Sequence, residues 1–169
     1  MTSIQESLCP GCGLKMPVST RPGKQGYYNT SMECWSLYTE VLCAEYSDAI
    51  LFGQVHQLTV DTYSSQHAGG PHPDKSVVVH LVGLFLMLER DVRPTGVPPF
   101  LQRLAGSIQT WPHFSPPADM GSITVFDIAL CESSEAHIKG VREWARIVWG
   151  CWAEHHAELS RLISYHLDL

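Results

Sequence analysis

Beyond residue 30, apolar residues recur every three to four positions along most of the chain, which is the spacing of an amphipathic α-helix. The first such segment begins at Ser31, a favourable N-cap residue, has Glu33 in its first turn and ends near residues 47–48. Further helices are expected in the segments that follow, at about 49–67, 75–89, 97–108, 124–130 and 134–166. The pattern therefore predicts an all-α fold, a helical bundle.

Three of these segments shape the expected architecture. Residues 75–89 are apolar nearly all round, so this helix is expected to be central and buried. Residues 124–130 suit a short helix or a strand, and the threonine at the N-cap position favours the helix. The segment 134–166 contains no helix breaker apart from Gly140 and Gly150, and a single helix of this length would be roughly 45 Å long. We therefore expect a long C-terminal helix.

The first part of the chain lacks the helical pattern. Residues 1–30 are rich in Gly, Pro, Ser and Thr, and we expect them to form an irregular arm that is pinned to the bundle. The chain of 169 residues has the size of one domain and contains no internal repeat or interdomain linker. The sequence thus predicts a single domain over 1–169, with an arm at 1–30 and a bundle at 31–169.

Charge and targeting signals narrow the class of function. Eleven Lys and Arg against seventeen Asp and Glu give a formal charge of −6, which argues against binding nucleic acid through a broad basic face. The first eight residues are polar, and the longest apolar run, 77–88, is too short to span a bilayer. We expect a cytoplasmic protein with neither nucleic acid nor a membrane as its partner.

The chain contains six cysteines and nine histidines. Cys43, Cys131 and Cys151 are isolated in apolar segments, and we expect them to be buried as small hydrophobic side chains in a reduced protein. Two others form the turn Cys9-Pro10-Gly11-Cys12-Gly13, which is typical of a zinc knuckle, because two thiolates at this spacing can bind one ion. A redox Cys-x-x-Cys and a plain loop are the alternatives, although the redox motif normally lies between a strand and a helix.

A closed zinc site needs four ligands, and the chain has no second Cys-x-x-Cys. The first two predicted helices are joined by a short connection, so they should be antiparallel neighbours. This places Cys34, at the start of the first, beside His67, at the end of the second. If the two residues are not metal ligands, Cys34 is simply a buried residue beside Trp35, and His67 lies at a solvent-exposed helix end. We predict a Zn²⁺ site formed by Cys9, Cys12, Cys34 and His67, with His72 and His80 as alternatives for the fourth position.

A second polar group lies on the helices predicted at 49–67 and 75–89. If these helices pack antiparallel about a loop near residue 70, opposed positions have numbers that sum to about 141, which pairs His80 with Asp61 and places His56 at the level of Phe85. Such a pair can hold a catalytic imidazole in one tautomer, or it can be a buried pair that fixes the helix register. His56, Asp61 and His80 are the candidate catalytic residues.

Three functions remain open on this basis. The first is a protein with a structural zinc ion and a His/Asp-lined cleft. The cleft would bind a small molecule or catalyse its reaction, and the loop 111–121 would cover it. The second is an interaction module that forms a homodimer through Trp144, Trp149 and Trp152. The alternative interpretation of these three tryptophans is that they pack in the core. The third is a metal-dependent hydrolase with an open zinc position, formed by His56, His80 and His155. A solvent-reachable pocket lined by the three candidate catalytic residues would favour an enzyme.

Several sequence blocks together resemble a known family. Cys9–Gly13, Glu33–Tyr38 and the block His56–Tyr63 followed by Gln66-His67 are similar to an uncharacterised bacterial family of small proteins. Val79–Leu81 and Trp152–His156 are similar as well, so the resemblance covers nearly the whole chain. The family has no assigned activity, and His72 lies outside its pattern, which favours His67 as the ligand. The resemblance implies these signature positions: Cys9, Cys12, Cys34, His56, Asp61, His67 and His80.

Overall fold

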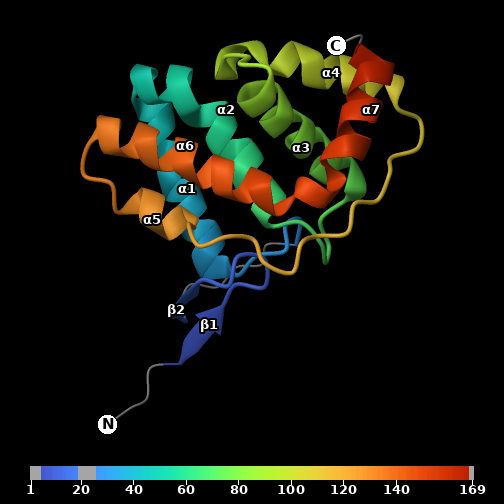
Figure 1. Ribbon diagram of the computed structural model, residues 1–169. Helices are drawn as coiled ribbons and strands as arrows, with labels where there is room; N and C mark the ends of the chain where they lie inside the picture. The colour runs from blue at the N-terminus through green and yellow to red at the C-terminus, as the bar shows by residue number, and fades with distance from the viewer. Residues whose placement is uncertain (1–4, 19–25, 168–169) are drawn as a thin grey trace.

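The computed structural model describes residues 5–18 and 26–167, and confirms the all-α prediction (Figure 1). Most of the described chain lies in seven α-helices, α1 (Met32–Ser47), α2 (Ala49–Gln66), α3 (Asp74–Glu89), α4 (Pro98–Ser107), α5 (Val125–Ala129), α6 (Ser134–Cys151) and α7 (His156–Leu167). Two short 3-10 helices, η1 (Pro94–Gly96) and η2 (Ala153–His155), precede α4 and α7. Within these described ranges, no helix is both long and apolar enough to cross a membrane.

Helix α2 is the centre of the bundle, and it packs against α1, α3 and α6. Helices α1 and α2 form the expected antiparallel hairpin, with Asp48 between them accepting hydrogen bonds from the amides of Ile50 and Leu51. Helix α3 is buried along most of its length, as its continuous apolar character predicts. Ser31 caps α1 as predicted, and Thr124 forms a capping box with Asp127, which explains why 124–130 is helical.

The prediction of one long C-terminal helix is wrong. Helix α6 ends at Cys151, and the chain bends through η2 before α7 begins at His156. The bend buries the Trp152 side chain completely and turns α7 back against α3 and α4. The His156 ring stacks on Trp149 at 3.9 Å, and its Nε2–H donates to the Trp149 carbonyl, which also accepts from the Trp152 amide at the helix end. A straight helix would carry the apolar face of α7 away from this core.

The tryptophans of the C-terminal segment lie in the core. Trp144, Trp149 and Trp152 are all buried within the protomer, so they form no exposed face for a dimer. The prediction that the three isolated cysteines are buried is wrong: Cys43 is exposed, and Cys131 and Cys151 are partly exposed. Cys43 lies on the outer side of α1, whereas the buried face of that helix follows the spacing of residues 34, 38, 41 and 45.

The N-terminal arm is more regular than expected. Strands β1 (Glu6–Leu8) and β2 (Lys15–Pro17) pair antiparallel, and this hairpin extends from the bundle near the start of α1 (Figure 1). The knuckle closes the hairpin, because the Cys9 amide donates to the Leu14 carbonyl and the Gly13 amide to the Cys9 carbonyl. Residues 19–25 of the predicted arm lie outside the described residues.

Candidate metal centre

Four side chains from three separate segments converge where the arm meets the bundle. Their ligand atoms all lie within 4.8 Å of one another, and this is the only such group of three or more Cys, His, Asp or Glu in the part of the chain that the structure describes. The group consists of Cys9, Cys12, Cys34 and His67. The antiparallel α1–α2 hairpin places Cys34 beside His67, which confirms the prediction from the short connection.

The two separations made by the Cys34 sulfur match those of a tetrahedral site. The Cys12 and Cys34 sulfurs are 3.8 Å apart, and the Cys34 sulfur is 3.4 Å from His67 Nε2. Tetrahedral zinc with ordinary bond lengths requires a separation of about 3.8 Å between two sulfurs and about 3.5 Å between sulfur and nitrogen. Three of the four side chains are buried, and Cys12 is partly exposed. An ion could therefore bind here with little movement of the ligands.

The surroundings fix the orientation of the histidine ligand. His67 Nδ1–H donates to the Tyr63 carbonyl at 2.7 Å, so the lone pair is on Nε2, the atom that faces the sulfurs. The Tyr63 ring stacks on the His67 ring, and its hydroxyl donates to the Cys34 sulfur at 3.6 Å. The Thr30 hydroxyl lies 3.5 Å from the Cys9 sulfur. These contacts are the outer-shell partners that a metal site requires.

The knuckle glycine Gly11 is required by close packing on His67. A Cβ atom at this position would lie 2.7 Å from His67 Cδ2 and would collide with the Asn29 carbonyl oxygen. Gly13 has a φ of 74°, in the left-handed region that favours glycine. The two glycines of the motif thus serve different purposes, one allowing close approach and the other allowing the turn.

The cluster is electrostatically suited to a cation. Hydrogen bonds from Cys12 and Cys34 lower the pKa of the Cys9 thiol far below its ordinary range, whereas Cys34 and Cys9 raise the pKa of Cys12. Burial lowers the pKa of His67, but the neighbouring sulfurs of Cys34 and Cys9 raise it more, to about 9. The sulfurs thus compete for protons at close range, and a metal ion would remove this competition by binding all of them as thiolates.

The two alternative histidines are not ligands in this group. His72 Nδ1–H donates to the His67 carbonyl at 3.1 Å, and its Nε2 accepts from the Ser76 hydroxyl at 2.8 Å. Burial lowers the pKa of His72 to about 4, so this ring is neutral near pH 7. His80 Nδ1–H donates to Asp61. Of the three candidate histidines for the fourth position, the structure therefore selects His67.

The predicted pairing of His80 with Asp61 is confirmed. His80 Nδ1 lies 2.7 Å from Asp61 Oδ1, and the Gln57 side-chain amide donates to the same oxygen at 3.0 Å. Asp61 is fully buried, and burial raises its pKa against the opposing effects of His80 and Gln57. Helix α3 makes room for this carboxylate at Gly83, where a Cβ atom would collide with it.

We expect Gly83→Ala to lower the free energy of unfolding by about 1–3 kcal/mol, because the new methyl group must displace the buried Asp61 carboxylate. Gly53→Ala is the matched control, since Gly53 lies within α2 with open space around it, and there we expect a gain of roughly 0.5–1 kcal/mol. Urea denaturation of both variants measures the difference. A Gly83→Ala variant as stable as wild type would contradict this close packing of α3 on Asp61.

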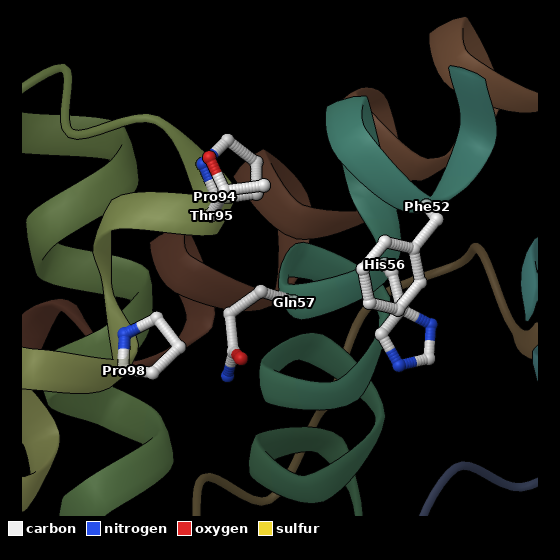
Figure 2. Close-up of a pocket in the computed structure, with 6 residues that line it drawn as sticks. All are labelled: Phe52, His56, Gln57, Pro94, Thr95 and Pro98. Carbon is white, nitrogen blue, oxygen red and sulfur yellow. The ribbon is translucent and has the colours of Figure 1, made fainter. Parts of the chain in front are cut away.

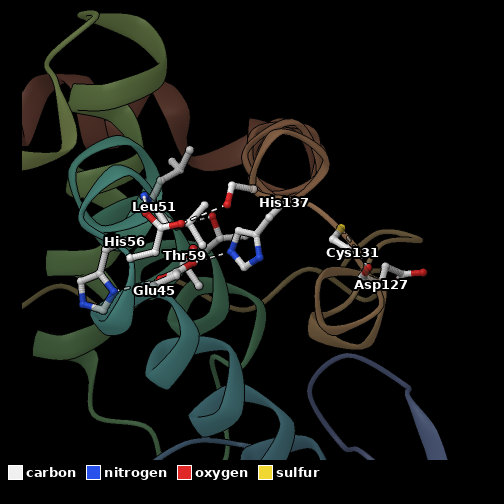
Figure 3. Close-up of polar contacts among 11 residues, drawn as sticks. Glu45, Leu51, His56, Thr59, Asp127, Cys131 and His137 are labelled. Carbon is white, nitrogen blue, oxygen red and sulfur yellow. Dashed lines mark hydrogen bonds and ion pairs between the residues drawn. The ribbon is translucent and has the colours of Figure 1, made fainter.

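His56 has a carboxylate partner that the sequence did not predict. Its Nδ1–H donates to Glu45 Oε2 at 2.9 Å, and the Glu45 carboxylate also accepts from Thr59 at 2.5 Å and from His137 Nε2–H at 2.9 Å. Figure 3 shows Glu45 between the two imidazoles. The carboxylate has no exposed surface and joins α1, α2 and α6.

Sequence reasoning missed Glu45 and His137. A signal was present, because Glu45 follows Cys34, Tyr38 and Val41 at the spacing of the buried face of α1. A carboxylate on a buried face needs hydrogen-bond donors, and here two imidazoles and a hydroxyl supply them. Which residues supply them could not be read from periodicity, because His137 lies 92 positions further along the chain.

The predicted second metal site of His56, His80 and His155 is not formed. The first two histidines donate to different carboxylates, and His155 Nε2–H donates to the Ser115 carbonyl at 3.0 Å. The three rings therefore lie in three separate environments. An open zinc position of this kind has no ligand set among the residues with described positions.

A small pocket of about 170 Å³ lies between α2 and the η1–α4 segment. Figure 2 shows its lining, with Phe52, His56 and Gln57 on one side and Pro94, Thr95 and Pro98 on the other. Of the three predicted catalytic residues, only His56 lines it; Asp61 and His80 do not, although Gln57 connects them to it.

The loop 111–121 does not cover the pocket beside His56. Residues 118–121 instead form, with the knuckle, the walls of a hollow of about 340 Å³. The Gln66 side-chain amide donates to the carbonyls of Met120 and Ile123, which holds this loop near the end of α2. The expectation of a lid over the His/Asp cleft is therefore wrong.

Fold and site together define a class, a small helical protein with a knuckle-based Cys3His group that could hold a metal ion. The chain belongs to the family of unknown function DUF5946, whose model matches residues 7–153 and so includes all four residues of the group. Searches of curated proteins and of solved structures gave no match.

Proposed function

We propose that Cys9, Cys12, Cys34 and His67 bind one zinc ion and that this zinc is structural. The supporting observation is that the protein itself supplies four ligand atoms within 4.8 Å of one another, and that the two separations made by Cys34 fit a tetrahedral site. Four protein ligands would leave no position for water or substrate. Three sulfurs and one imidazole nitrogen are a typical donor set for zinc. The ion would join the hairpin to the start of α1 and to the end of α2.

Thiolate ligands require a reducing environment. All six cysteines are free thiols, and the exposed Cys43 has no cysteine partner. This pattern supports a cytoplasmic location, because disulfides are rare there and zinc–thiolate sites persist.

Metal analysis of the purified protein tests the assignment. We expect one equivalent of zinc per chain, and replacement by cobalt(II) should give the strong visible absorption of a tetrahedral thiolate site. A protein that folds normally with no bound metal would contradict a structural zinc, and bound iron would contradict the choice of metal.

A second proposal concerns the pocket beside His56, which we infer to bind a small molecule. The His56 ring is 12% exposed, and its Nδ1–H is held by Glu45. No residue in the described ranges forms a hydrogen bond with Nε2, so this nitrogen is free to accept a proton or a hydrogen bond from a ligand. A fixed tautomer with a free Nε2 is the arrangement that a general base requires. Asp61 and His80 would act only as positioning residues, through Gln57.

A fragment screen monitored by amide NMR shifts tests this pocket. We expect hits to shift the signals of Phe52, His56 and Thr95, and His56→Gln to weaken those hits that bear a hydrogen-bond donor. His113→Gln is the control, because His113 is an exposed histidine paired with Asp74 elsewhere on the surface. Hits that never affect the pocket signals would contradict the proposal.

A further inference from the structure

A second hollow, of about 290 Å³, lies next to the pocket beside His56, and three arginines line it. Arg142 and Arg146 are one turn apart on α6, so their side chains are neighbours, and Arg93 comes from the connection between α3 and α4. Pro94 lines both the hollow and the pocket. We call this hollow the arginine hollow.

The arginine hollow carries an uncompensated positive charge. Three arginines and one acidic residue, Asp91, line it, which gives a local charge of +3 − 1 = +2 in a chain whose formal charge is −6. In the described part of the chain, no carboxylate forms an ion pair with Arg93, Arg142 or Arg146. An anion that entered the hollow would therefore meet guanidinium groups that are not already neutralised.

The geometry favours an oxyanion. The guanidinium of Arg142 donates to the Gln54 side-chain oxygen at 3.1 Å, which limits its movement and leaves its other N–H groups free. Buried Leu58 also lines the hollow. Guanidinium groups bind carboxylate and phosphate oxygens in a bidentate manner, and a hollow lined by three arginines is suited to a doubly charged group.

We propose that the arginine hollow binds the phosphate or carboxylate group of a small molecule whose ring occupies the pocket beside His56. The second half of this statement rests on the proposed function of that pocket, whereas the anion site does not. A cavity of about 150 Å³ is known to accommodate benzene. The pocket, at about 170 Å³, therefore has room for a six-membered ring.

Phenyl phosphate, inorganic phosphate and benzoate are the probes, with binding measured by calorimetry on the zinc-loaded protein. Phenyl phosphate should bind more tightly than inorganic phosphate, because it adds the ring contact. Benzoate carries the same ring on a singly charged group, so its affinity relative to phenyl phosphate decides between the two anions.

The double variant Arg93→Gln/Arg146→Gln should lower the affinity for both phenyl phosphate and inorganic phosphate by at least about tenfold, since hydrogen bonds to charged groups are lost. Neither arginine side chain donates a hydrogen bond to another residue of the described chain, so the double variant should fold normally. Arg161→Gln, which removes an exposed arginine on α7, is the matched control and should change nothing. Phe52→Ala should abolish only the advantage of the phenyl group.

The outcomes distinguish the anion site in the arginine hollow from the ring-binding site in the pocket beside His56. Loss of phosphate binding in the arginine variant, with no phenyl advantage in wild type, would support the anion site and contradict the pocket proposal. Phosphate binding that is unaffected by Arg93→Gln/Arg146→Gln, or no binding by wild type, would overturn the anion site itself.

Discussion

Cys34→Ser is expected to abolish stoichiometric zinc binding and to destabilise the protein more than loss of any side chain outside the metal centre. Cys34 is fully buried between the knuckle and His67, so no other group can replace its thiolate. Zinc binding contributes about 10–16 kcal/mol in small zinc-finger peptides, and loss of one thiolate should lower the free energy of unfolding by at least roughly 3 kcal/mol. Metal content and thermal unfolding measure the two effects.

Cys43→Ser is the matched control. Cys43 lies on the same helix but is exposed, so this variant should keep its zinc and its stability. A strong chelator should destabilise wild type and Cys43→Ser by similar amounts and have little effect on Cys34→Ser, which has already lost the ion. A Cys34→Ser protein with a full equivalent of zinc would remove Cys34 from the site.

Glu45→Ala should have the second largest effect, lowering the free energy of unfolding by about 3–5 kcal/mol. The substitution leaves the Thr59 hydroxyl and the imidazoles of His56 and His137 without their shared acceptor in a buried environment. Glu45→Gln retains the size of the side chain but has one acceptor oxygen, so it should lower the free energy of unfolding by an intermediate amount. Chemical denaturation with each variant gives the comparison.

Glu40→Ala serves as the control for this series. Glu40 is on the same helix, five positions earlier, and is exposed, so removing its carboxylate should change stability little. If Glu45→Ala unfolds at the same denaturant concentration as Glu40→Ala, the three hydrogen bonds to Glu45 contribute no net stability. Histidine NMR signals of His56 and His137 should also move in Glu45→Ala and stay in place in the control.

Three polar centres thus hold one set of helices together. The Cys3His group joins the hairpin to α1 and α2, Glu45 joins α1 and α2 to α6, and Asp61 joins α2 to α3. Helix α2 contributes to all three, which agrees with its central place in the bundle. The pocket beside His56 borders two of these centres, through His56 and through Gln57. Its wall on α2 is therefore fixed by hydrogen bonds to two buried carboxylates.

Features that depend on local chain geometry were predictable from the sequence. The short connection between the first two helices required an antiparallel hairpin, and this hairpin places Cys34 beside His67. The loop after α2 set the register that pairs Asp61 with His80. Periodicity and capping residues located the helices, because each depends on interactions within a few positions. In these cases a small number of neighbouring residues determined the result.

Features that depend on contacts between distant segments required the tertiary structure. The bend after Cys151 buries Trp152 and allows α7 to pack against α3 and α4. The partners of Glu45 and the meeting of Arg93 with Arg142 and Arg146 join elements far apart in the sequence. The sequence by itself determined which residues could bind a metal ion or share a helix face. Only packing decided which side chains met, because burial and hydrogen bonding are satisfied across the whole core at once.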